Sequence, residues 1–179
     1  KDRKFIREYN YYCLPFLVLF LFLALKFRNL VDFKFFVALL LIFSSIVILN
    51  KRKFSSFREI FFKSKKIILV GIGKIHGFTN MGGSFLSVYS TLISKNIKEV
   101  SRYYISYGYL IMGLIQYLLV LFLASETLSF SKLYYALIVL IIYFPTQKIF
   151  KNINDRKFSK YINLIALLYG LIIITSYLN

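Results

Sequence analysis

A short polar segment interrupts one of the most apolar stretches of the chain. The segment KIHGFTNMGGSF, residues 74–85, contains a lysine, a Gly-Gly pair and His76, the one histidine of the sequence. Lys74 is also the one charged residue between positions 67 and 94. Ionisable side chains inside apolar spans are costly, and they therefore mark candidate functional sites.

The residue types in this segment favour an anion site. Glycine lets a backbone approach a ligand closely, and a helix that begins there presents free N–H groups and a partial positive charge. None of the seven acidic residues of the chain lies deep in an apolar stretch. We therefore expect a site built from this segment and from one polar side chain in a later apolar stretch, with these residues: Lys74, His76, Gly77, Asn80, Gly82, Gly83, Ser84 and Gln116.

Each candidate could instead have a purely structural role, and the sequence leaves this open. Lys74 follows Lys66 by about 12 Å along a helix, so its ammonium group can reach back to the membrane surface. The structural roles open to the remaining candidates are packing for His76, helix capping for Asn80, a hydrogen bond between helices for Gln116 and close helix packing for Gly82 and Gly83.

The sequence offers little for catalysis or for a bound cofactor. One cysteine, Cys13, and one histidine allow neither an internal disulfide nor a Cys-based metal site. No carboxylate stands near His76 in the sequence to complete a catalytic group, and a phosphate-binding loop of the P-loop type is missing. We expect no metal, no cofactor and no enzymatic activity. A membrane-embedded enzyme that uses His76 is a weaker alternative.

The elements that must hold the polar segment are apolar helices. Of the 179 residues, 59% are hydrophobic and 20% are aromatic. Runs of roughly 17–25 apolar residues match the hydrocarbon core of a bilayer, and helices satisfy their own backbone polar groups there. The sequence therefore predicts an all-α integral membrane protein with about five full transmembrane helices. They lie in stretches without Asp, Glu, Lys or Arg, namely residues 9–25, 35–50, 103–125, 133–147 and 161–179.

The stretch that contains the polar segment fits a broken or re-entrant hairpin better than an ordinary span. The preceding segment 51–66, KRKFSSFREIFFKSKK, has seven Lys or Arg and one Glu, which is typical of the cytoplasmic side. A hairpin that enters and leaves on one face also keeps the basic segments 95–102 and 148–160 in the cytoplasm, whereas a full span would separate 51–66 from 148–160. We expect the helix break between Gly77 and Ser84.

The formal net charge of the chain is +17. Because the cations stand in loops beside apolar stretches, cytoplasmic orientation and anionic lipid explain this charge better than nucleic acid does. We therefore expect the lipid bilayer and a small anionic solute as partners, no nucleic acid, and a multi-pass location in the cell (plasma) membrane. The oligomeric state stays open, and the chain could form a homo-oligomer.

An internal repeat supports a transporter-like architecture. The segments FRNLVDFKF, residues 27–35, and FKNINDRKF, residues 150–158, align without gaps at an offset of 123, and each lies between two apolar stretches. Inverted repeats are common in transporters and place the substrate site at the repeat interface. The chain begins with KDRKFIRE, and the partner of segment 66–123 would precede it, so we expect an N-terminal truncation. The predicted parts are the end of a first repeat at 1–50, a basic cytoplasmic linker at 51–66 and a second repeat at 67–179.

The segment HGFTNMGGSFLSVYSTLI, followed by KEVSRYYIS and a long apolar span, resembles the TauE/SafE family of sulfite and organosulfonate exporters. Gly77, Gly82 and Gly83 match the family's Gly-x-x-Gly-x-Gly-Gly motif, whereas Asn80 and Ser84 depart from it. The segment FKNINDRKFSKYINLIALLYGLIII is similar to the family's C-terminal signature. The resemblance implies a secondary permease for small anions such as sulfite or sulfonates. A non-transporting membrane scaffold or assembly subunit is the competing interpretation.

Overall fold

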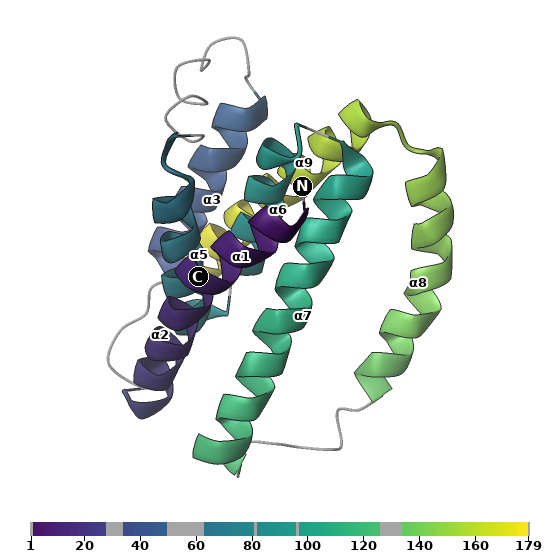
Figure 1. Ribbon diagram of the computed structural model, residues 1–179. Coiled ribbons are helices and arrows are strands. Elements are labelled where there is room, and N and C mark those ends of the chain that lie inside the picture. Colours follow the sequence, from purple (N-terminus) through teal and green to yellow (C-terminus); the bar gives the residue numbers. More distant parts are fainter. Residues whose placement is uncertain are drawn as a thin grey trace.

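The computed structural model describes residues 2–27, 34–49, 63–80, 82–95, 97–125 and 134–178. The regular secondary structure within these ranges is helical, which confirms the all-α prediction for this part of the chain (Figure 1). The helices are α1 (Asp2–Tyr12), α2 (Leu14–Lys26), α3 (Lys34–Leu49), α5 (Lys65–Thr79), α6 (Gly82–Ile93), α7 (Lys98–Leu123), α8 (Tyr134–Asn152) and α9 (Asp155–Leu178).

Three helical segments of the described chain are long and apolar enough to cross a membrane, namely Arg3–Lys26, Lys98–Leu123 and Asp155–Ser176. They indicate a multi-pass membrane protein. The other two predicted spans correspond to α3 and α8, which do not meet the same measure of length and composition. Helix α3 has 16 residues, and α8 ends in the polar sequence TQKIFKN.

The predicted helix break lies at Asn80. Helix α5 ends at Thr79, and Asn80 adopts a left-handed backbone conformation with φ of 59°. Its N–H group donates to the carbonyl oxygen of His76 at 2.9 Å, which closes the last turn. Asparagine tolerates this conformation better than most residues, and α6 then begins at Gly82. The structure therefore confirms a break between Gly77 and Ser84.

Close packing of α5 against α2 depends on two glycines one turn apart. A Cβ atom at Gly73 would overlap the backbone carbonyl of Cys13, and one at Gly77 would lie 2.8 Å from the carbonyl oxygen of Leu17. Small residues spaced by four let two helical backbones approach each other in a membrane. The sequence GKIHG thus fixes the seam between α2 and α5.

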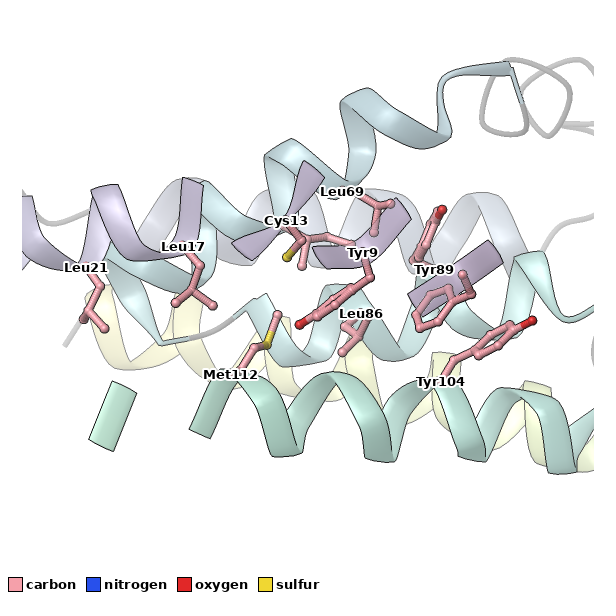
Figure 2. Packing of buried hydrophobic residues seen from close by; sticks show 11 residues of the cluster. Tyr9, Cys13, Leu17, Leu21, Leu69, Leu86, Tyr89, Tyr104 and Met112 are labelled. Carbon is pink, nitrogen blue, oxygen red and sulfur yellow. The ribbon is translucent and has the colours of Figure 1, made fainter. Parts of the chain in front are cut away.

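The larger buried cluster fills the space between the α1–α2 segment, α5, α6 and α7 (Figure 2). The hydroxyl group of Tyr9 donates to the carbonyl oxygen of Gly108 at 3.2 Å and so joins α1 to α7. Cys13 is fully buried here as a small core residue. The cluster consists of Phe5, Tyr9, Cys13, Leu17, Leu21, Leu69, Ile72, Leu86, Tyr89, Tyr104 and Met112.

A second cluster joins α6 to the pair formed by α3 and α9. Gly170 allows the close approach within that pair, because a Cβ atom there would lie 2.8 Å from the side chain of Ile42. The buried members are Ala38, Leu41, Val88, Leu92, Ala166 and Ile173. Helix α6 therefore packs into both clusters, and its first turns stand between α7 and α9.

Helix α8 stands apart from the bundle (Figure 1) and packs extensively against no other helix of the described chain. It is attached at its C-terminal end. The ammonium group of Lys98 donates to the carbonyl oxygens of Phe150 at 3.0 Å and of Ile153 at 2.6 Å. Arg102 donates to Gln147 at 2.8 Å. Carbonyl groups at a helix end have no partner within the helix, so Lys98 caps α8, whereas Arg102 binds the side chain of Gln147 near the same end.

Several expectations lie outside the described residues. These include positions 28–33 of the first repeat copy and positions 51–62 of the predicted basic linker. The repeat, the truncation and the division into three parts stay predictions.

Candidate functional site

A pocket of about 340 Å³ opens at the break between α5 and α6. Its walls come from the residue that ends α5, from the first turns of α6, from one side chain of α7 and from one face of α9. The lining residues are Asn80, Gly83, Ser84, Ser87, Tyr109, Ile162, Ile165, Ala166 and Tyr169. We call this space the α5–α6 pocket.

Three of the predicted site residues, Asn80, Gly83 and Ser84, line the α5–α6 pocket. They come from the break itself and from the N-terminal turn of α6, where the first N–H groups have no partner within the helix. That end of a helix carries a partial positive charge. The helix break therefore does more than redirect the chain, because it exposes the start of α6 to a cavity.

The polar groups of the lining suit an anion. They are one carboxamide, on Asn80, and the hydroxyl groups of two serines and two tyrosines. These groups can donate hydrogen bonds, and among them the Ser87 hydroxyl already donates to the carbonyl oxygen of Gly83 at 3.1 Å. None of the described lining residues is charged. An acceptor-rich carboxylate would disfavour an anion, and a lysine or arginine would bind it too tightly for easy release.

Gly83 brings the α6 backbone against the ring of Tyr109. A Cβ atom at position 83 would lie 2.5 Å from the hydroxyl oxygen and from two ring carbons of Tyr109. The tyrosine is 46% exposed, so a larger residue at position 83 would displace its ring and change this wall of the pocket. Gly83 thus sets how closely α7 closes one wall of the α5–α6 pocket.

Gln116 is not among the residues that line the α5–α6 pocket. Its Nε2 group donates to the Oδ1 atom of Asn80 at 2.9 Å, so α7 holds the residue that ends α5. Of the two roles left open by the sequence, Gln116 therefore has the structural one, a hydrogen bond between helices. A contact between Gln116 and the substrate stays a prediction.

His76 is buried directly beneath the start of α6. It is 3% exposed, and a Cβ atom at Gly82 would overlap the first carbon of its side chain. Neither ring nitrogen has a hydrogen-bond partner among the described residues, although the side chain of Gln116 lies beside the ring. Leaving a buried polar group without a partner costs about 1–3 kcal/mol. A residue retained at that cost is a candidate for function.

Two predicted site residues lie on the opposite side of α5, toward α2. The ammonium nitrogen of Lys74 lies 5.6 Å from the ring centre of Phe16 and 5.5 Å from that of Phe20, and this geometry is favourable for a cation above an aromatic face. Gly77 packs against the α2 backbone. Neither residue lines the α5–α6 pocket.

The sequence did not predict the other six lining residues. Ser87 follows Ser84 and Gly83 at helical spacing, so a helix beginning at the Gly-Gly pair would have placed it on the same face. Tyr109 and Tyr169 gave no comparable signal, because nothing in the sequence states that α7 and α9 meet at the start of α6.

No group of three or more His, Cys, Asp or Glu residues within the described ranges lies close enough to hold a metal ion. Comparison of the chain with models of known families, with curated protein sequences and with solved structures finds no match.

Proposed function

We propose that this chain belongs to a secondary membrane permease for small anions, and that the α5–α6 pocket is its substrate site. The observation that carries the proposal is the pocket itself: an uncharged cavity of about 340 Å³ that meets the N-terminal turn of α6 within a bundle of apolar helices. Sulfite and organosulfonates are the proposed substrates because the segment around the Gly-Gly pair resembles the TauE/SafE exporters.

The physical argument rests on desolvation. An anion loses its water when it enters an apolar bundle, and it needs several donors in compensation. Non-helical backbone within a membrane is tolerated where protein or a water-filled cavity covers it. A half-helix end supplies donors and partial positive charge without a permanent full charge. Binding is then strong enough for entry and weak enough for release.

In this proposal α5 and α6 form a re-entrant hairpin whose two ends lie on the cytoplasmic face. An exposed lysine at each end, Lys66 in the first turn of α5 and Lys95 just after α6, supports that orientation. The inverted repeat, the further membrane spans and the plasma membrane location belong to the same proposal.

Transport by the full chain in proteoliposomes tests the function. We expect saturable uptake of sulfite and of methanesulfonate, and loss of uptake in Gly83→Val, whose side chain fills the space between α6 and Tyr109. The matched control is Gly113→Val on α7, because a Cβ atom at Gly113 meets nothing within 4 Å.

Two outcomes would contradict the proposal. One is that the wild-type protein transports none of sulfite, methanesulfonate and chloride. The other is that Gly83→Val inserts normally and transports each anion at the wild-type rate, because the site would then lie elsewhere.

A further inference from the structure

The hydrogen bond between Gln116 and Asn80 has a direction. Gln116 donates its Nε2 group, and Asn80 accepts with Oδ1 at 2.9 Å. A carboxamide carries its acceptor on one branch and its two donors on the other. Because Oδ1 is turned toward α7, the Nδ2 group of Asn80 is left for the pocket that this residue lines. Nδ2 donates to no other group in the part of the chain that the structure describes.

The orientation of this amide matters because the lining has no charge of its own. The Ser87 hydroxyl group donates to the carbonyl oxygen of Gly83 at 3.1 Å, so it offers the pocket an acceptor, whereas the other hydroxyl groups of the lining can serve as donors or acceptors. Asn80 is the one carboxamide among the described lining residues, and Gln116 sets its orientation. Turned one way it offers a donor to the ligand, and turned the other way it offers an oxygen that repels an anion.

We propose that Gln116 is a positioning residue that holds the Asn80 amide with its donor side toward the α5–α6 pocket, and that this arrangement selects a singly charged oxyanion. The inference rests on the proposed function. It adds a role for a residue outside the lining, and it narrows the substrate class.

His76 lies beside Gln116, the residue that donates to Asn80. Since Gln116 uses Nε2 toward Asn80, its Oε1 atom remains as an acceptor, and the His76 ring lies beside this side chain. Neither ring nitrogen has a hydrogen-bond partner among the described residues, so the ring limits the movement of the Gln116 side chain by lying beside it.

The absence of a cation from the described lining sets the charge of the ligand. One negative charge can be met by the Asn80 amide, the hydroxyl groups and the start of α6. A second charge would add a much larger desolvation cost with no side chain to offset it. Methanesulfonate and hydrogensulfite, the singly charged form of sulfite, should therefore be accepted and sulfate rejected, although all three are small oxyanions.

The experiment is a double-mutant cycle on methanesulfonate uptake by the full chain in proteoliposomes. Asn80→Gly removes the amide and keeps the left-handed backbone accessible. Gln116→Met keeps the length of the side chain and removes the donor. We expect each variant to raise KM about tenfold, as for loss of one hydrogen bond to a charged group. The double variant should have the KM of Asn80→Gly alone, because Gln116 acts through Asn80.

The control is Gln147→Met, which makes the same substitution on α8, where Gln147 contacts Arg102 outside the lining. It should leave KM unchanged. Additive effects of the two variants, or a wild-type KM in Gln116→Met, would overturn the positioning role while leaving the proposed function in place. Equal uptake of sulfate and methanesulfonate by the wild-type protein would overturn the charge selection. Absence of saturable uptake of every anion by the wild-type protein would instead refute the proposed function.

Discussion

Gly83 of α6 lies against the ring of Tyr109 of α7, so that a Cβ atom at position 83 would be 2.5 Å from three atoms of that residue. This contact joins the helix that begins at the break to the helix that covers it. The width of the α5–α6 pocket therefore depends on the Tyr109 ring and on the lack of a larger side chain at position 83.

The contact predicts a suppressor. If Gly83→Val blocks transport by meeting the Tyr109 ring, then removing the ring in Gly83→Val/Tyr109→Ala should restore part of the uptake rate. The control pair is Gly83→Val/Tyr117→Ala, because Tyr117 is an exposed α7 tyrosine outside the described lining. Equal rates in the two double variants would show that the steric explanation is wrong.

The seam between α2 and α5 predicts opposite effects for two neighbouring glycines. Gly73→Ala should lower the free energy of unfolding in detergent by about 1–3 kcal/mol, because the new methyl group meets the Cys13 backbone. Gly71→Ala on the same helix meets nothing within 4 Å. It should be neutral or stabilising by up to about 1 kcal/mol through helix propensity. Similar changes in both variants would rule out the packing role of Gly73.

The hairpin topology predicts that both ends of the α5–α6 unit face the same side. Lys66→Cys and Lys95→Cys, each in a Cys13→Ala background, should react with an impermeant maleimide added from one side of the membrane. Both lysines are exposed, so the probe can reach either position. If the two positions were labelled from opposite sides, the hairpin would be wrong, and the α5–α6 unit would cross the membrane.

Replacing the buried His76 should stabilise the protein and weaken transport. His76→Leu removes two ring nitrogens that have no partner among the described residues. The free energy of unfolding should therefore rise by about 1 kcal/mol. Anion uptake should fall, because the Gln116 side chain loses its neighbour. A variant that is more stable and transports at the wild-type rate would make His76 a packing residue alone.

Hydropathy and turn-forming residues predicted much of the fold. The apolar stretches became helices, and the Gly and Asn residues of the polar segment marked the interruption at Asn80. The predicted first span, 9–25, differs in detail: helix begins at Asp2 and is interrupted at Cys13 before Pro15. An amphipathic segment such as α1 has mixed composition, so a search for uncharged runs passes over it.

The site was predicted in part, and the reason is physical. Asn80, Gly83 and Ser84 are local features of the break, whereas Tyr169 and Ile165 come from a helix far along the chain. Their contribution depends on which face of α9 meets α6. A helix that is apolar on all sides has no polar face, so its sequence does not show which side packs against a neighbour. Lys74 was an expected site residue because charge within an apolar stretch is rare, but its neighbours Phe16 and Phe20 belong to α2.

The contacts at the C-terminal end of α8 have a geometric consequence. The helix has 19 residues and is therefore about 28 Å long, and Lys98 and Arg102 make their hydrogen bonds at the end nearest α9. A change of about 10° in the direction of the helix at that end would displace its other end by about 5 Å. These two side chains of α7 therefore help to set the path of the whole of α8.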